Sequence, residues 1–233
     1  MPATGIHGIV NFLVYRSAGK YREGIRMNKY LGYGFVLGAF IPDYDPLISL
    51  IIWAFSGDYR VENLARIHEA FHRTLTHSII TVAVITIIAL LIKYKSERAG
   101  SILLGISAGI FLHILIDLPY MVGVAILWPV IPQKMGLFWS LPPLIDHVRQ
   151  ALFKFWYAVF FWMIYYFAKE RISKFTRAII MIFVGFFIVT LIFVAFPTIF
   201  DIIHGILELI SLVLVGILLY KDREVIMKAM TQT

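Results

Sequence analysis

Histidine and aspartate side chains recur within the apolar segments of this chain. They are His7, Asp43, Asp45, His72, His77, His113 and Asp117. Ionisable groups are costly in apolar segments, so they are candidates for a functional site. Neutral imidazole and carboxylate are ligands for zinc, and carboxylates extend the range to manganese or magnesium. The chemistry that these residue types indicate is therefore a divalent metal site.

The spacing of the carboxylates suits such a site. His113 and Asp117 are four residues apart, so one face of a helix presents both. Asp43 and Asp45 follow Pro42, and we expect a helix end there at which both carboxylates can turn inward.

His72 and His77 are five residues apart and cannot share a face of one continuous helix. If Thr74 or Thr76 caps the helix that follows, His72 lies on the preceding loop and His77 in the first turn. Loop and helix would then supply two ligands from different directions.

The candidate residues also fall at similar depths. At a rise of about 1.5 Å per helical residue, Asp43, His77 and His113 lie roughly 21, 24 and 22 Å from the nearest basic loop. His7 is shallower. Successive segments that run alternately up and down thus bring acids and imidazoles to one level, which favours a single site.

Composition identifies the elements that must position this site as membrane helices. Hydrophobic residues form 60% of the 233 residues and charged residues 15%, with a mean hydropathy of +0.83, against roughly 45–50% and 25% in soluble domains. A globule of this size cannot hide so much apolar surface from water. Disorder, collagen-like repeats and nucleic-acid binding are excluded, and the lack of cysteine excludes thiolate sites.

The hydropathy pattern predicts one all-α membrane domain over residues 1–233, with about seven helices. Five segments suit a spanning helix: 75–93, 99–118, 149–168, 177–200 and 202–220. Segments 46–56 and 120–131 follow acid–proline sequences and are expected to be re-entrant or interfacial. Segments 3–18 and 27–42 form an expected hairpin. Asp201, His204 and Glu208 fall at helical spacing, which predicts a solvated loop or interhelical hydrogen bonds.

Basic residues predict the orientation of this multi-pass protein in the cell membrane. Fifteen of the 21 lysines and arginines lie in residues 16–29, 93–100, 169–177 and the tail after 220, and five lie in 57–74 and 132–150. Because cytoplasmic loops are enriched in these residues, the first set is predicted to be cytoplasmic. The candidate site then lies on the extracytoplasmic side. The formal charge of +7 is thereby assigned to a membrane surface.

The ordered motifs resemble the YdjM-like family of membrane-bound metal-dependent hydrolases. The resemblance covers residues 1–131 and rests on His7, Ile41-Pro42-Asp43-x-Asp45, His72-Arg73-x-x-Thr76-His77-Ser78, His113-x-x-x-Asp117 and Leu127-Trp128-Pro129. That family is itself similar to zinc-dependent phospholipase C proteins. The resemblance implies a metal site formed by His7, Asp43, His72, His77, His113 and Asp117, with Asp45 beside it. Residues 132–233 are then additional transmembrane helices.

The predicted function is hydrolysis of a phosphoester with a lipid portion. A divalent metal, with zinc favoured, would activate water, Asp45 would accept its proton, and Arg73 would hold a phosphate oxygen. The expected partners are membrane lipid and a lipid-linked substrate, with no nucleic acid; the oligomeric state is open. Two alternatives remain at this point: a metal-ion or proton transporter, and a non-enzymatic protein with a structural metal site.

Overall fold

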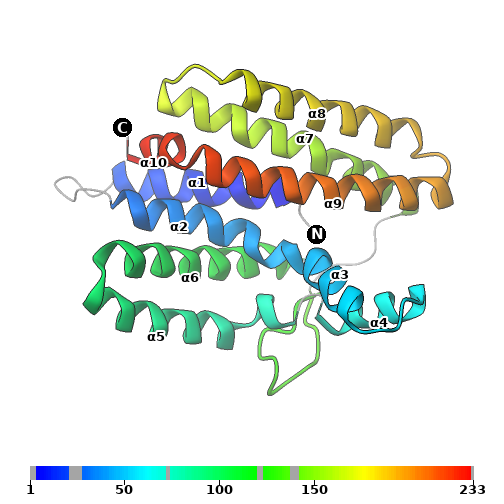
Figure 1. Ribbon diagram of the computed structural model, residues 1–233, viewed down its shortest axis with the longest axis horizontal. Coiled ribbons are helices and arrows are strands. Elements are labelled where there is room, and N and C mark those ends of the chain that lie inside the picture. Colours follow the sequence, from blue (N-terminus) through cyan, green and yellow to red (C-terminus); the bar gives the residue numbers. More distant parts are fainter. Residues whose placement is uncertain (1–3, 21–27, 72–73, 120–122, 137–141, 232–233) are drawn as a thin grey trace. The chain divides into compact units, whose positions relative to one another are not determined.

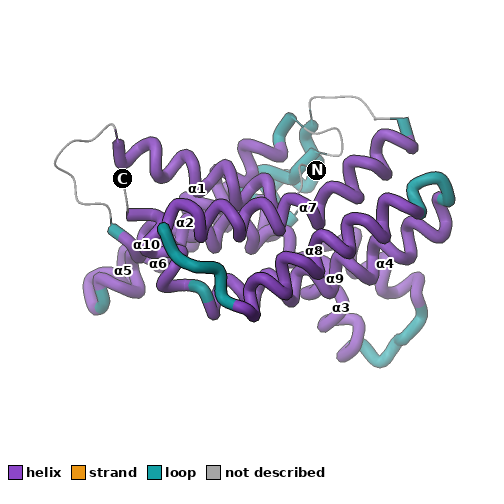
Figure 2. The backbone as a smooth tube through the Cα atoms, turned by 90° about the horizontal axis from the view of Figure 1, so that it is seen from above, coloured by secondary structure: helices purple, strands orange, loops and turns teal. Residues whose placement is uncertain are grey.

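The computed structural model describes residues 4–20, 28–71, 74–119, 123–136 and 142–231. These residues form helices and connecting loops, with one isolated bridge between Val124 and Met135 in place of any strand (Figures 1 and 2). The all-α prediction is confirmed. The α-helices are α1 Thr4–Lys20, α2 Lys29–Phe40, α3 Asp45–Phe55, α4 Val61–Phe71, α5 Ile79–Lys95, α6 Glu97–Asp117, α7 Pro143–Ala168, α8 Lys174–Ile192, α9 Pro197–Lys221 and α10 Arg223–Thr231, and the 3-10 helices are η1 Ile41–Tyr44 and η2 Leu75–His77.

Among the described residues, five helical stretches are long and apolar enough to cross a membrane: Lys29–Phe55, Glu97–Asp117, Pro143–Ala168, Lys174–Ile192 and Pro197–Lys221. A sixth is added if Val61–His77 and Ile79–Lys95, bent by 54°, count as one span. The expected number of about seven helices is therefore approximate.

The chain forms two compact units, Gly34–Trp139 and Pro2–Tyr33 with Ser140–Thr233. In the first unit, α5 and α6 lie side by side (Figure 1). Ser96 joins them and caps α6, because its side chain accepts a hydrogen bond from the Ala99 backbone N–H. Thr86 and Ser107 then link the two helices through their hydroxyl groups, 2.6 Å apart.

Close backbone contact holds the second half of α2 against α6. A Cβ added at Gly38 would lie 2.3 Å from the carbonyl oxygen of Ile106, and one at Gly109 would lie 2.3 Å from that of Phe35. Backbone atoms cannot move aside as a flexible side chain can, so only glycine fits at these positions. This contact fixes the end of α2, and with it η1, next to the last turns of α6.

A loop after α6 closes the first unit. Val124 packs with Ile110 and Ile114 of α6 in a buried apolar cluster. The Ser78 hydroxyl donates to the carbonyl oxygens of Ile126 and Trp128, at 3.2 and 2.6 Å. The loop is thereby attached to the residue that caps the start of α5.

The second unit is built on α7. Helices α1, α8, α9 and α10 all contact it. The approach of α1 is close, since a Cβ at Gly5 would lie 2.5 Å from the carbonyl carbon of Trp156. Several large side chains of α7 are fully buried, including Tyr157, Phe160 and Phe161.

The observed boundaries differ from the expected segments at three places. Pro42 and Pro46 are the second residues of η1 and α3, in the first turn, where no backbone N–H is needed. Residues 45–55 therefore form α3, which continues the span begun by α2 after a 3-10 turn. Residues 123–131 form turns and loop, and 120–122 lie outside the described residues. The expected segments 177–200 and 202–220 are divided earlier than predicted, because Pro197 begins α9. α8 ends at Ile192.

Candidate metal centre

Three elements of the first unit bring histidine and aspartate side chains together. η1, η2 and the end of α6 contact one another. Asp43 lies in η1, and Asp45 is the first residue of α3. His77 ends η2, and His113 lies one turn before Asp117 on α6.

Ser78 explains the position of His77. Its side chain accepts a hydrogen bond from the Ile80 backbone N–H and so caps α5. The expectation that Thr74 or Thr76 would cap this helix is wrong, because neither begins α5. His77 consequently lies in the preceding 3-10 turn, held between η1 and α6.

The centre of the cluster is His77, His113 and Asp117. The Nε2 atoms of the two histidines lie 3.4 and 3.5 Å from Oδ2 of Asp117, and the three ligand atoms lie within 4.8 Å of one another. The side chains are 0%, 0% and 1% exposed. This is the compact donor set that a metal ion requires.

The ring nitrogens that face away from the centre have partners of their own. Nδ1 of His113 lies 2.8 Å from the carbonyl oxygen of Ala39, which can only accept a hydrogen bond. Nδ1 of His77 lies 3.1 Å from the Thr76 hydroxyl oxygen and 3.7 Å from Oδ2 of Asp45. In the neutral rings these contacts place the proton on Nδ1 and the lone pair on Nε2, as in histidines that bind metal.

This protonation pattern tests whether the side chains of the cluster fit a metal ion. The two Nε2 lone pairs and an oxygen of ionised Asp117 would all face one another, which is repulsive unless a cation or a proton lies between them. Oδ2 of Asp43 is buried and has no hydrogen-bond partner among the described residues. Neutral imidazoles and ionised carboxylates suit a divalent cation in such a buried place, so these side chains fit a metal ion.

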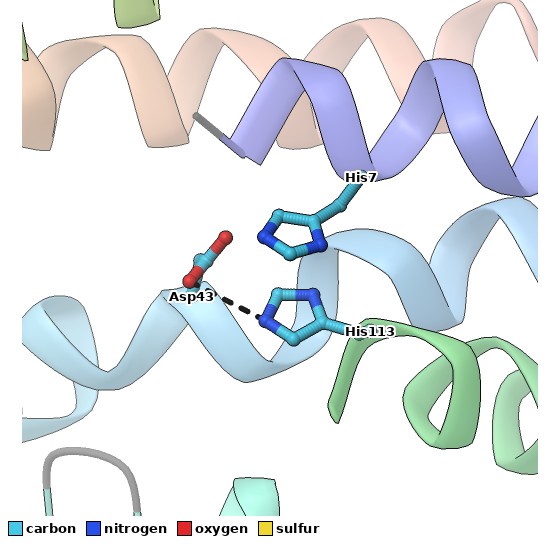
Figure 3. Close-up of side chains that lie close together, drawn as sticks. All are labelled: His7, Asp43 and His113. Atoms are coloured by element: carbon cyan, nitrogen blue, oxygen red, sulfur yellow. Dashed lines mark ion pairs between the residues drawn. The ribbon is translucent and has the colours of Figure 1, made fainter. Parts of the chain in front are cut away.

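Asp43 extends the cluster on the other side of His113. Its Oδ1 lies 3.7 Å from Nε2 of His113, and its side chain is 8% exposed. Figure 3 shows the carboxylate and the imidazole turned toward one another from η1 and α6. Asp43 and Asp117 thus both approach the same ring nitrogen.

Asp45 contacts the cluster through His77. Its Oδ2 faces the outer ring nitrogen of His77, and its Oδ1 accepts a hydrogen bond of 2.7 Å from the Thr76 hydroxyl. Asp45 is buried. Thr76 and the Ala39 carbonyl were not among the predicted site residues; Thr76 lies inside the His-Arg motif, whereas a backbone carbonyl leaves no signal in a sequence.

The structure therefore brings together Asp43, Asp45, His77, His113 and Asp117. His7 lies on α1 in the second unit, and its role as a ligand stays a prediction. His72 and Arg73 lie outside the described residues, so their roles also stay predictions.

The helices and the cluster define a class: a helical membrane protein whose first unit holds buried histidines and aspartates able to bind a metal ion. The family is shown by a comparison with family models. Residues 1–197 match the YdjM inner membrane protein family, and the chain belongs to it. No curated protein and no solved structure matches the chain.

Proposed function

We propose that this protein is a metal-dependent hydrolase that cleaves a phosphoester with a lipid portion. The observation that carries the proposal is the buried arrangement of His77, His113 and Asp117, in which both imidazoles have their outer nitrogens engaged. A divalent ion bound there would supply Lewis acidity and lower the pKa of water to near neutrality.

His77, His113 and Asp117 would hold the ion, and zinc is favoured because two of the three donors are imidazole nitrogens. His7 and His72 are the expected further ligands. The near-complete burial of the donors supports tight binding, since a charged cluster in a low dielectric is stable only when it is neutralised.

Asp43 and Asp45 have different surroundings and would have different roles. Both oxygens of Asp45 face His77 and Thr76, which favours a positioning role for Asp45 in place of proton acceptance. Asp43 has one oxygen near His113 and the other without a hydrogen-bond partner among the described residues. Asp43 is therefore the proposed acceptor for the proton that water loses.

The membrane location favours a substrate with a lipid portion. The cluster lies at the end of α6, which is long enough to cross the bilayer, so a lipid-linked phosphoester could approach from the membrane. The distribution of basic residues predicts that this end is extracytoplasmic. Arg73 is the proposed group for a phosphate oxygen, because a guanidinium binds such oxygens in bidentate fashion.

The test uses the full chain, purified without chelator and placed in lipid nanodiscs. Metal content is measured by elemental analysis, and turnover is measured on a panel of phosphoesters and phospholipids. Asp43→Asn should retain metal and lose turnover by about 10²–10⁴-fold. Arg73→Lys should weaken turnover more than metal content.

Liposomes with the same protein separate the rival functions. Ion flux without turnover on any substrate would overturn the hydrolase in favour of a transporter. Neither activity, with metal bound and stability dependent on it, would leave only a structural metal site.

A further inference from the structure

The second unit contains a separate polar network in the membrane-spanning part of α7 and α9. The ammonium group of Lys154 lies 2.9 Å from Oε2 of Glu208 and 2.7 Å from Nδ1 of His204. The Tyr157 hydroxyl donates a 2.7 Å hydrogen bond to Oε1 of Glu208. The Lys154 and Tyr157 side chains have no exposed surface.

This network has a higher free-energy cost than an apolar contact between the two helices. A charged side chain at the centre of a membrane helix costs about 2.5–3.5 kcal/mol on insertion, whereas an interhelical hydrogen bond in a membrane contributes only about 0.6 kcal/mol on average. An apolar pair at Lys154 and Glu208 would hold α7 and α9 at least as well. Helix packing alone therefore does not account for these charges.

The protonation states follow from the contacts. An ammonium group only donates hydrogen bonds, so Nδ1 of His204 accepts and the neutral ring carries its proton on Nε2. Glu208 is ionised, since it faces the Lys154 ammonium and accepts from Tyr157. The network thus holds one positive and one negative charge, and the Glu208 carboxylate is its proton acceptor.

A second ionisable pair lies nearer the start of both helices, two turns before Lys154 on α7 and one turn before His204 on α9. His147 Nε2 lies 3.9 Å from Oδ1 of Asp201, whose side chain is 68% exposed. Phe200 separates this pair from the inner network: its ring stacks on His147 with centroids 4.4 Å apart and on His204 with centroids 5.4 Å apart. Phe200 itself is fully buried, and its ring contacts both His147 of the exposed pair and His204 of the inner network.

The elements packed around the network contribute further ionisable and aromatic groups. Arg149 and Asp146 pair with each other on α7 and act on His204 electrostatically. From α8, Phe183 packs its ring on Tyr157. α1 passes Tyr157 at Gly5 and carries His7 in the same turn, and the Lys228 of α10 pairs with Glu170 at the far end of α7.

We propose that Glu208, Lys154, His204 and Tyr157 form a proton-binding site in the second unit, reached from the Asp201 end of α9 and gated by the ring of Phe200. In the binding step, a hydronium ion gives its proton to the Glu208 carboxylate and leaves as water. Lys154 keeps its charge and its hydrogen bond to His204. The network gains one positive charge, and the attraction between Lys154 and Glu208 is lost, so proton binding loosens α7 from α9.

Infrared spectroscopy of the full chain in nanodiscs tests the site. On acidification, the protonated-carboxyl absorption of wild type should contain a component that is missing in Glu208→Gln and present in Asp222→Asn, a control at the other end of α9. Lys154→Met should raise the pH at which the band appears by about 1–3 units, because the neighbouring cation is gone. A carboxyl titration in Glu208→Gln identical to that of wild type would overturn the site.

The gate has its own test in the rate of band formation after a pH jump. Phe200→Leu should take up the proton at least tenfold faster than wild type (roughly 1.4 kcal/mol of barrier), whereas Phe183→Leu, a buried aromatic beyond the network, should not. Equal rates in both variants would overturn the gate. If no Glu208 component titrates in wild type, the network serves helix packing alone and the proposal fails.

Discussion

His77 and His113 contact one another edge to face, with ring centroids 5.1 Å apart and planes at 72°. This angle lets two rings from different elements direct their Nε2 atoms at one carboxylate. Two histidines stacked in parallel with the same orientation would direct their Nε2 lone pairs in parallel and not toward one point. The mutual arrangement of the rings is thus already that of two ligands around a common centre.

Replacement of either ring should remove metal. His77→Ala and His113→Ala are expected to lower metal affinity by more than about 100-fold, since loss of groups that only orient ligands already costs about 10–100-fold. Isothermal titration with zinc measures the effect. His68→Ala is the matched control, because His68 lies on α4 and contacts Ser49. Unchanged zinc affinity in both ligand variants would show that the cluster is polar packing.

Metal removal should destabilise the protein. At a metal concentration 100-fold above the dissociation constant, binding contributes about 2.7 kcal/mol, which corresponds to roughly 5–10 °C in melting temperature for a chain of this size. Chelator should lower the melting temperature by that amount, and added zinc or manganese should restore it. The same treatment of His113→Ala should produce no shift; a shift of equal size there would place the metal elsewhere.

The glycine contact between α2 and α6 should matter for both stability and metal. Gly38→Ala is expected to destabilise the protein by about 1–3 kcal/mol through overpacking and to weaken metal binding, since it pushes α6, with His113 and Asp117, away from the end of α2 and the turns packed there. Gly205→Ala is the control, because a Cβ there meets nothing within 4 Å and should be neutral or stabilising by up to about 1 kcal/mol. Thermal melts and zinc titrations compare the two. Equal effects of the two substitutions on melting temperature and zinc affinity would refute the argument that the contact between α2 and α6 positions the metal site.

Membrane orientation can be measured with single cysteines, since the chain has none. Glu97→Cys and Lys174→Cys should react with an impermeant thiol reagent only after cells are permeabilised, because both lie in basic, predicted cytoplasmic connections. Tyr59→Cys, at an exposed position in a predicted outer connection, should react in intact cells. The reverse pattern would place the metal cluster on the cytoplasmic side.

The sequence predicted much of the first unit. His113 and Asp117 were expected on one face of a helix because they are four residues apart, and α6 carries both. Asp43 and His77 were expected at a similar depth, and η1 and η2, which carry them, contact one another. Spacing could not predict that Asp45 faces His77 instead of the centre. That depends on the 3-10 turn between α2 and α3, in which a small change in helix type rotates successive side chains.

The second unit was less predictable. Lys154 alone did not indicate a site. The helical spacing of Asp201, His204 and Glu208 allowed two interpretations: a solvated loop or interhelical hydrogen bonds. For His204 and Glu208, the structure supports the interhelical reading. The sequence could not identify α7 as the helix that pairs with α9, because helical periodicity shows which residues share a face but not which faces of two helices meet.

The order of the cluster residues along the chain has a consequence for biosynthesis. Asp43 is made before α3, α4 and α5, whereas Asp117 is the last residue of α6. The donor set is therefore incomplete until α6 has been synthesised and inserted into the bilayer. Metal capture would be a late event in maturation, and a chain halted before α6 would hold acidic and imidazole side chains in the membrane without the ion that neutralises them.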